Sequence, residues 1–419
     1  MFESFSIIFT IAAFFSFINY KWLKLPTTIG LMILSILLVL LISVSKTTLP
    51  SVYNFFCDMV LNADFKTLLL DVILSFLLFA GALHVNLSSL AKEKTSIILF
   101  ATLGVLISTS VVGGLLYFAT QLLNISLPFI HALLFGALIS PTDPIAVMAI
   151  LKKANIQEKL SIKIEGESLF NDGIGVVVFT GILLIASVTS GHHTNEVVFE
   201  IGTLFLEEAV GGILYGLLLG YLGYRCIHSL KNNPHLAVII SLAIVLGGYT
   251  LASKLGVSGP LAMVVAGLII GNKIHVNINT TEVQQALTEF WGILDEVFNG
   301  VLFVLMGLAA HLLSFNSSFM LLGIVTIGIV LIARFSAVFL PYALLKHENE
   351  NQMKAISILT WGGLRGGISL ALALSLDENL SGNLLLHITY IVVVFSILIQ
   401  GLTIGKLVKK MYPKKHYKM

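Results

Sequence analysis

The chain has 419 residues, of which 57% are hydrophobic and only 11% are charged, and its mean hydropathy is +0.97. Soluble domains carry roughly 25% charged residues, so this composition excludes a soluble globular protein and indicates an integral membrane protein. A net charge of +2 without a basic groove gives no case for a nucleic-acid partner. Long apolar runs, instead of the short alternating segments of a β-barrel, predict an all-α polytopic fold in a lipid bilayer.

Hydropathy predicts about thirteen transmembrane helices. The first is interpreted as a retained span, because residues 1–20 lack the basic start and small-residue cleavage site of a signal peptide. We expect the helices at approximately 3–20, 25–44, 67–85, 95–122, 129–151, 162–187, 199–226, 235–253, 257–272, 288–311, 317–345, 354–375 and 384–406.

The distribution of Lys and Arg predicts how these helices cross the membrane. Nineteen of the 24 basic residues fall in the loops and tail of one side, three fall on the other side, and Arg334 and Arg365 lie within spans. Cytoplasmic loops carry the excess of positive charge. We therefore expect an outside N-terminus, a cytoplasmic C-terminus and a bacterial inner (plasma) membrane location. Residues 1–411 form one predicted membrane unit, and 412–419 form a short basic tail.

Ionisable side chains interrupt the span predicted at 162–187, where a charged residue costs roughly 2.5–3.5 kcal/mol at the bilayer centre. Acids at this depth mark functional sites by default. Inside this span the string EGESLFNDG at 165–173 contains Glu165, Glu167, Ser168, Asn171 and Asp172.

Two predicted helices are broken in a matching way. One is interrupted at 141–144 by two prolines that flank Thr142 and Asp143, and the other at 361–367 by four glycines around Arg365. Proline removes a backbone donor, and glycine lowers helix propensity by up to about 1 kcal/mol. The breaks lie seven helices apart, so the two halves of the chain have opposite topology. Inverted repeats with interrupted helices point to the binding site of a secondary transporter.

Asp172 is the centre of the predicted chemistry. Burial disfavours a charged carboxylate, which either a proton or a small hard cation can neutralise. Ser168 lies one turn before Asp172 on the same helix face, and Asp143 with the freed Thr142 carbonyl could face them from the break. If a proton and a cation compete for Asp172, the site can cross the membrane only when it holds one of the two. The single carboxylate of the Asn171-Asp172 pair fits one-for-one exchange without net charge movement.

Other charged residues in the spans receive weaker interpretations. Arg365 suits a fixed counter-charge and is expected to pair with Glu167 or Asp143, with Arg334 as a possible second buried basic residue. We expect Glu207 and Glu208 at the membrane interface, and Asp71 could line an outer funnel. Asp295 and Glu296 could lie at the interface or on the ion pathway.

The assembled motifs resemble the monovalent cation/proton antiporters, specifically the short-tailed prokaryotic sodium/proton exchangers. The matching strings are GALISPTDP at 136–144, GESLFNDG at 166–173 and WGGLRGGIS at 361–369, with weaker matches at 257–262 and 298–307. Gly367 departs from the alanine of many relatives.

The resemblance implies an ion site with named residues. It implies Na⁺ held by Asp143, Ser168, Asp172 and the Thr142 main chain, with Asn171 shaping the site and Arg365 ion-paired near Glu167. It also implies a homodimer in which core helices (about 95–187 and 317–406) move against a dimerisation scaffold (about 3–85 and 199–311). No cofactor is expected beyond the transported Na⁺ or Li⁺ and H⁺.

Two alternatives stay open at the level of sequence, and a third is disfavoured. A K⁺/H⁺ antiporter would use the same scaffold, and the sequence does not encode the choice among Na⁺, Li⁺ and K⁺. A sodium-coupled symporter of an organic solute would need a roomy polar or aromatic pocket around the breaks. An intramembrane protease is disfavoured, because no histidine is expected near Ser258 at the membrane centre and Asp172 lacks a Gly-x-Gly-Asp context. The protein is therefore predicted not to be an enzyme.

Overall fold

The computed structural model describes residues 2–46, 48–61, 69, 72–144, 147–148, 151, 158–188, 194–230, 233–277, 281–313, 317–345 and 352–412. Regular structure in these ranges is helical, apart from one isolated bridge between two extended residues. The predicted all-α fold is confirmed.

The N-terminal half contributes ten α-helices to this description. In chain order they are α1 (Phe2–Ile18), α2 (Thr27–Ser45), α3 (Pro50–Leu61), α4 (Leu74–His84), α5 (Leu87–Lys92), α6 (Lys94–Leu122), α7 (Phe129–Ile139), α9 (Glu158–Val188), α10 (Thr194–Ser229) and α11 (Pro234–Lys254). A π-helical turn, Asn19–Leu23, follows α1.

The C-terminal half begins with three long helices and then becomes more segmented. Its α-helices are α12 (Gly259–Asn277), α13 (Thr281–Leu308), α14 (Ser317–Leu344), α15 (Gln352–Trp361), α16 (Gly367–Leu374), α17 (Gly382–Phe395) and α18 (Gly401–Met411). Short 3₁₀ turns lie at Ala309–Leu312 and Glu378–Leu380, and a π-helical turn, Ser396–Gln400, joins α17 to α18.

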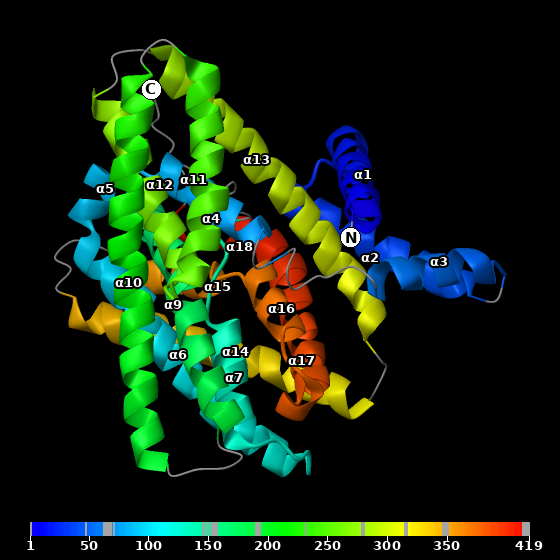
Figure 1. Cartoon of the computed structure of the whole chain (residues 1–419). Coiled ribbons are helices and arrows are strands. Elements are labelled where there is room, and N and C mark those ends of the chain that lie inside the picture. Colours follow the sequence, from blue (N-terminus) through cyan, green and yellow to red (C-terminus); the bar gives the residue numbers. More distant parts are fainter. Residues whose placement is uncertain are drawn as a thin grey trace, which may run out of the picture.

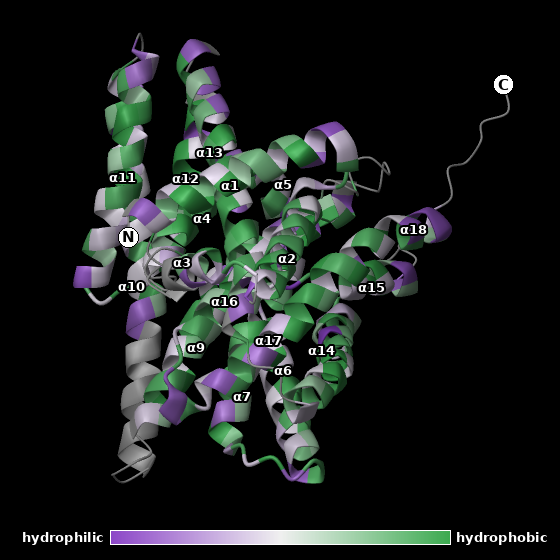
Figure 2. Cartoon of the chain, turned by 90° about the vertical axis from the view of Figure 1, so that its right-hand side faces the viewer, coloured by the Kyte–Doolittle hydropathy of each residue, from purple (hydrophilic) through white to green (hydrophobic). Residues whose placement is uncertain are grey.

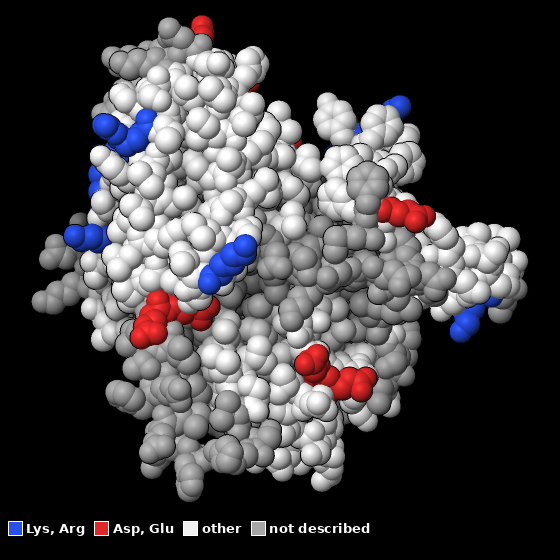
Figure 3. Space-filling model, viewed as in Figure 1, with Lys and Arg blue, Asp and Glu red and all other residues white. Residues whose placement is uncertain are grey.

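Within the described ranges, nine helices are long and apolar enough to cross a membrane, and three shorter apolar helices accompany them. The predicted count of thirteen spans stays a prediction. In Figure 2 hydrophobic colour dominates the bodies of the helices, and hydrophilic residues gather at several of their ends. Among the described residues on the face drawn in Figure 3, charged side chains form only a few small groups. Both views fit a protein whose helices lie in lipid.

Helix packing places α13 at the boundary of a large cavity. Helices α6, α7, α9, α14, α16 and α17 pack against one another, and α4, α10, α11 and α12 form a second packed group. Helix α13 packs on α1 and α2 and also on α4 and α11, and Figure 1 shows it running diagonally between them. One face of α13 is consequently available to line the space in front of α7, α9 and α16.

Candidate functional site

The two helix breaks meet at one point. Helix α7 ends at Ile139 and is followed by an extended segment, while α15 ends at Trp361 and α16 restarts at Gly367. The backbone N–H of Asp143 donates to the carbonyl of Leu364 at 2.8 Å, which forms the isolated antiparallel bridge. Irregular backbone at this depth is tolerated where it is buried in protein or lines a cavity. The crossing therefore brings non-helical main-chain groups of the two segments together at a protected site.

Gly366 is required by the close approach of the two segments. A Cβ atom at this position would lie 2.7 Å from the Asp143 Cβ and 2.8 Å from its Oδ2. We predict that Gly366→Ala displaces Asp143, lowers exchange activity and destabilises the fold by about 1–3 kcal/mol through overpacking. The matched control is Gly328→Ala, because a Cβ there meets no atom within 4 Å. Flux assays and thermal unfolding in detergent measure both effects, and equal behaviour of the two variants would contradict the prediction.

Helix α9 supplies side chains that hold the first break. The Ser168 hydroxyl donates to the main-chain carbonyl of Thr142. The Asn171 amide donates from Nδ2 to the Thr142 hydroxyl at 2.8 Å, and its Oδ1 accepts from the Thr142 N–H at 3.4 Å. All three residues are buried. Asn171 thus holds both the main-chain N–H and the hydroxyl of Thr142. Ser168 bonds to the Thr142 carbonyl, which the sequence predicted to face it.

Asp172 and Asp143 reach the same cavity. Its volume is ≈ 1390 Å³, and its wall includes both carboxylates together with Thr142 and Ser168. Asp172 and Asp143 are close enough to repel each other when both are charged. The structure therefore brings together the four residues predicted as oxygen ligands, with Asn171 behind them. Two carboxylates, a hydroxyl and a carbonyl are the donor types that hard cations prefer.

The arginine pairing predicted from the sequence is corrected by the structure. Glu167 forms its ion pair with Arg334 of α14: Nη1 contacts Oε1, and Nη2 donates to Oε2 at 3.1 Å. The Arg334 Nε also donates to the carbonyl of Leu359 at 3.3 Å. Both members of the pair are buried, at 6% and 2% exposure. The guanidinium approaches Glu167 in a two-pronged geometry that is stronger than a single contact.

Arg365 hydrogen-bonds to the main chain of the first helix break, whereas it was expected to pair with Glu167 or Asp143. Its Nη1 donates to the main-chain carbonyls of Ser140 and Pro141, the latter at 3.1 Å. Within the described chain, its Nε and Nη2 have no hydrogen-bond partner. The carbonyl of Ser140 would normally accept from the residue four positions on, but that residue is Pro144, which has no N–H. The arginine therefore stabilises the carbonyl that the proline leaves unpaired.

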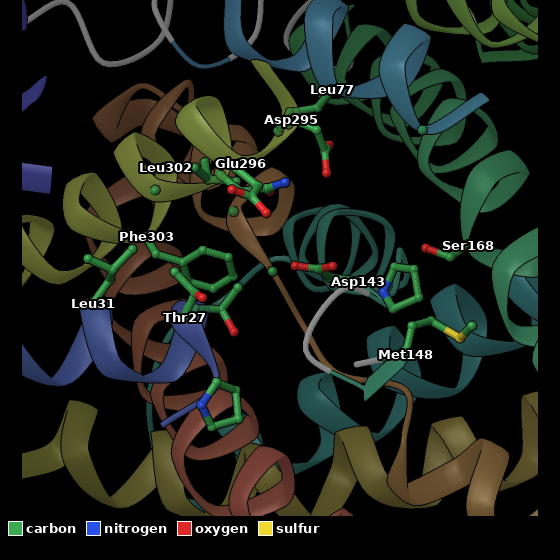
Figure 4. A pocket seen from close by; sticks show the side chains of 18 of the residues that line it. Thr27, Leu31, Leu77, Asp143, Met148, Ser168, Asp295, Glu296, Leu302 and Phe303 are labelled. Atoms are coloured by element: carbon green, nitrogen blue, oxygen red, sulfur yellow. The ribbon is translucent and has the colours of Figure 1, made fainter. Parts of the chain in front are cut away.

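The cavity also contains residues that the sequence did not clearly assign. Asp295 and Glu296 of α13 line it, as do Thr28 of α2 and Asn299. Figure 4 shows Asp295 and Glu296 entering from α13, with Asp143 standing between them and Ser168. The sequence left these two acids between the interface and the pathway, and the structure places them on the cavity wall. Their acidic character inside a predicted span was the signal that could have found them.

The remaining acids lie elsewhere. Glu207 is exposed and Glu208 is half-buried on α10, and neither belongs to the described wall of this cavity. Asp71 falls outside the described residues.

Comparison with known proteins gives a consistent result. The family model described as "Sodium/hydrogen exchanger, transmembrane" matches residues 8–410. The chain is 42% identical over 402 residues to the Na⁺/H⁺ antiporter NhaP of Pseudomonas aeruginosa, covering 95% of this chain and 94% of that protein. It is 33% identical to the Na⁺/H⁺ antiporter NhaH of Halobacillus aidingensis, covering 93% of each.

The fold also matches a solved structure. The sodium proton antiporter MjNhaP1 of Methanocaldococcus jannaschii superposes with a TM-score of 0.75 at 21% identity, and the match covers 98% of both chains. The broken helices crossing beside paired carboxylates, the family match over nearly the whole chain and the 42% identical relative lead to one conclusion. The chain belongs to the transmembrane sodium/hydrogen exchanger family.

Proposed function

We propose that this protein exchanges Na⁺ or Li⁺ for H⁺ across the membrane at a site formed by Asp143, Thr142, Ser168 and Asp172. The observation that carries the proposal is the meeting of these four residues at one cavity, in a member of this family. The relatives reported above are named Na⁺/H⁺ antiporters, which gives no support to a K⁺/H⁺ antiporter or an organic-solute symporter.

Exchange follows from competition at Asp172. In the cation-loaded form, carboxylate oxygens of Asp172 and Asp143, the Ser168 hydroxyl and the Thr142 carbonyl replace part of the hydration shell. In the proton-loaded form, Asp172 is a neutral acid. The empty form leaves a desolvated negative charge, which is costly and opposes the crossing step. Because one carboxylate takes either one proton or one cation, the exchange is one-for-one and electroneutral.

The crossing step is a movement of a core domain against a fixed scaffold. The core comprises approximately residues 95–187 and 317–406, and the scaffold comprises approximately 3–85 and 199–311. The packing of α6, α7, α9, α14, α16 and α17 into one group supports this division. Scaffold helices form the interface of a homodimer. In a plasma membrane the N-terminus lies outside and the C-terminal tail is cytoplasmic, in agreement with the excess of basic residues on that side.

The test is ion flux in proteoliposomes made with purified protein. An imposed pH gradient is expected to collapse on addition of Na⁺ or Li⁺, at the same rate whether or not valinomycin and K⁺ clamp the membrane potential. A clamp-dependent rate would contradict the electroneutral stoichiometry, and a response to K⁺ alone would contradict the Na⁺ assignment. Protein-free liposomes provide the leak rate. An absence of cation-driven flux above that leak would overturn the proposed antiport.

A further inference from the structure

A second group of oxygen atoms lies on the α13 side of the cavity. Asp295 is half-buried and Glu296 is exposed, and both line the cavity wall. In Figure 4 the carboxyl groups of Asp295, Glu296 and Asp143 point into a common space. Asp295 interacts electrostatically with Asp143 across that space. Carboxylates from α13 and from the extended segment after α7 thus face one volume of ≈ 1390 Å³.

Buried oxygens without partners accompany these acids. Asn299 lies one turn after Asp295 on α13, and both residues line the cavity. Asn299 is only 5% exposed, and its Oδ1 has no hydrogen-bond partner among the described residues. The same holds for the hydroxyl of Thr28, which is 6% exposed and also lines the cavity. Unpaired buried polar atoms are costly, so two of them on one wall indicate that something else satisfies them.

Packing of α2 on α13 brings the start of α2, which contains Thr28, to the part of α13 that contains Asn299. Gly300 faces Leu31, and Gly307 faces Ser35, so residue numbers rise together along the two helices. The helices therefore run parallel, and the first turn of α2 lies beside the turn of α13 that contains Asn299. A carboxylate, an amide oxygen and a hydroxyl from two adjacent helices are suitable partners for a hydrated monovalent cation.

Basic side chains are held at the mouth of the same cavity. Lys21 and Lys24 line it, and both are exposed. The Lys21 ammonium lies over the rings of Phe17 and Trp22, at 5.8 and 5.2 Å from their centroids. These contacts hold the Lys21 ammonium against aromatic rings at the end of α1.

We propose that Asp295, Asn299 and Thr28 form a second cation-binding station on the scaffold side of the cavity, separate from the exchange site. This inference rests on the proposed function, because the station supplies cations to that site. Na⁺ pauses there with most of its water and then moves to Asp143 and Asp172, where it is dehydrated further. Glu296 at the open edge adds negative potential that concentrates cations in the cavity.

The kinetic test compares Asp295→Asn with wild-type protein in proteoliposomes. The apparent KM for Na⁺ is expected to rise roughly three- to tenfold while the maximal rate changes by less than about twofold, because only cation supply is weakened. Glu289→Gln is the matched control: it removes an exposed acid from the same helix, away from the described cavity wall, and leaves KM unchanged. An unchanged KM in Asp295→Asn would overturn the proposal.

A binding test separates this proposal from the proposed function. Na⁺-dependent thermal stabilisation, measured against choline chloride at constant ionic strength, is expected to persist weakly in Asp143→Asn/Asp172→Asn. It should disappear when Asp295→Asn is added. Loss of all Na⁺ stabilisation already in the double variant would overturn the station. Binding can be present even if the wild-type protein shows no antiport, so failure of one proposal does not imply failure of the other.

Moving the charge along α13 tests the geometry. In Asp295→Asn/Asn299→Asp the carboxylate moves one helical turn and stays on the cavity wall. The apparent KM for Na⁺ is expected to return to within about twofold of the wild-type value, because charge and oxygen ligands are both retained. If the relocated charge leaves KM as high as in Asp295→Asn alone, Asp295 acts by holding α13 in place, and the station is contradicted.

Discussion

Exchange is expected to fall to the leak of protein-free liposomes when Asp172 is replaced by asparagine. The substitution keeps the shape of the side chain but removes the group that a proton or a cation neutralises. Asp143 and the Ser168 hydroxyl, which donates to the Thr142 carbonyl, remain in the cavity, so a defect in Asp172→Asn reports the loss of the exchangeable charge. Initial rates of Na⁺-driven proton flux measure the effect directly.

The control for this variant is an acid outside the cavity. Glu207→Gln removes an exposed carboxylate from α10 and is expected to retain the wild-type rate. Both variants must reach the membrane and unfold at wild-type temperatures in detergent, so that a lost flux is not a lost fold. Appreciable Na⁺/H⁺ exchange in Asp172→Asn would show that another carboxylate carries the proton, and the competition mechanism would be wrong.

Removing Arg334 is expected to cause the largest loss of stability among single substitutions in the core. Arg334→Met leaves Glu167 buried at 2% exposure without its bidentate partner. An unpaired buried charge typically costs about 3–5 kcal/mol, whereas removal of both charges is often nearly neutral. The double variant Arg334→Met/Glu167→Met should therefore recover most of the stability that Arg334→Met loses. Thermal unfolding in a mild detergent provides the comparison.

A second double-mutant cycle tests which arginine is the partner of Glu167. The coupling energy between Arg365→Met and Glu167→Met is expected to be clearly smaller than that between Arg334→Met and Glu167→Met. The reason is that Arg365 donates to the carbonyls of Ser140 and Pro141. Directly contacting residues couple by roughly 0.5–3 kcal/mol, and independent sites add to within about 0.5 kcal/mol. A larger coupling for Arg365 than for Arg334 would reverse the assignment.

The sequence was sufficient for the class of fold and for the breaks because both depend on local properties. A 57% hydrophobic chain has to place its helices in lipid. Pro141 and Pro144 interrupt hydrogen bonding wherever they occur, and so does a run of glycines around Arg365. The four-residue spacing of Ser168 and Asp172 fixes their common helix face without reference to any other helix. These features predicted which residues approach Thr142, and the structure brings them there.

Tertiary structure alone decided which partners meet across the bundle. Arg334 and Arg365 are equivalent counter-charges in the sequence, but the packing of α14 brings Arg334 onto Glu167. Arg365 instead donates to the carbonyl of Ser140, to which Pro144 has no N–H to donate. Asp295 was likewise ambiguous, because only the packing of α13 on α2 and α4 turns it towards Asp143. Pairing over 167 residues depends on helix positions in space, and hydrophobic periodicity specifies which residues are buried but not what they contact.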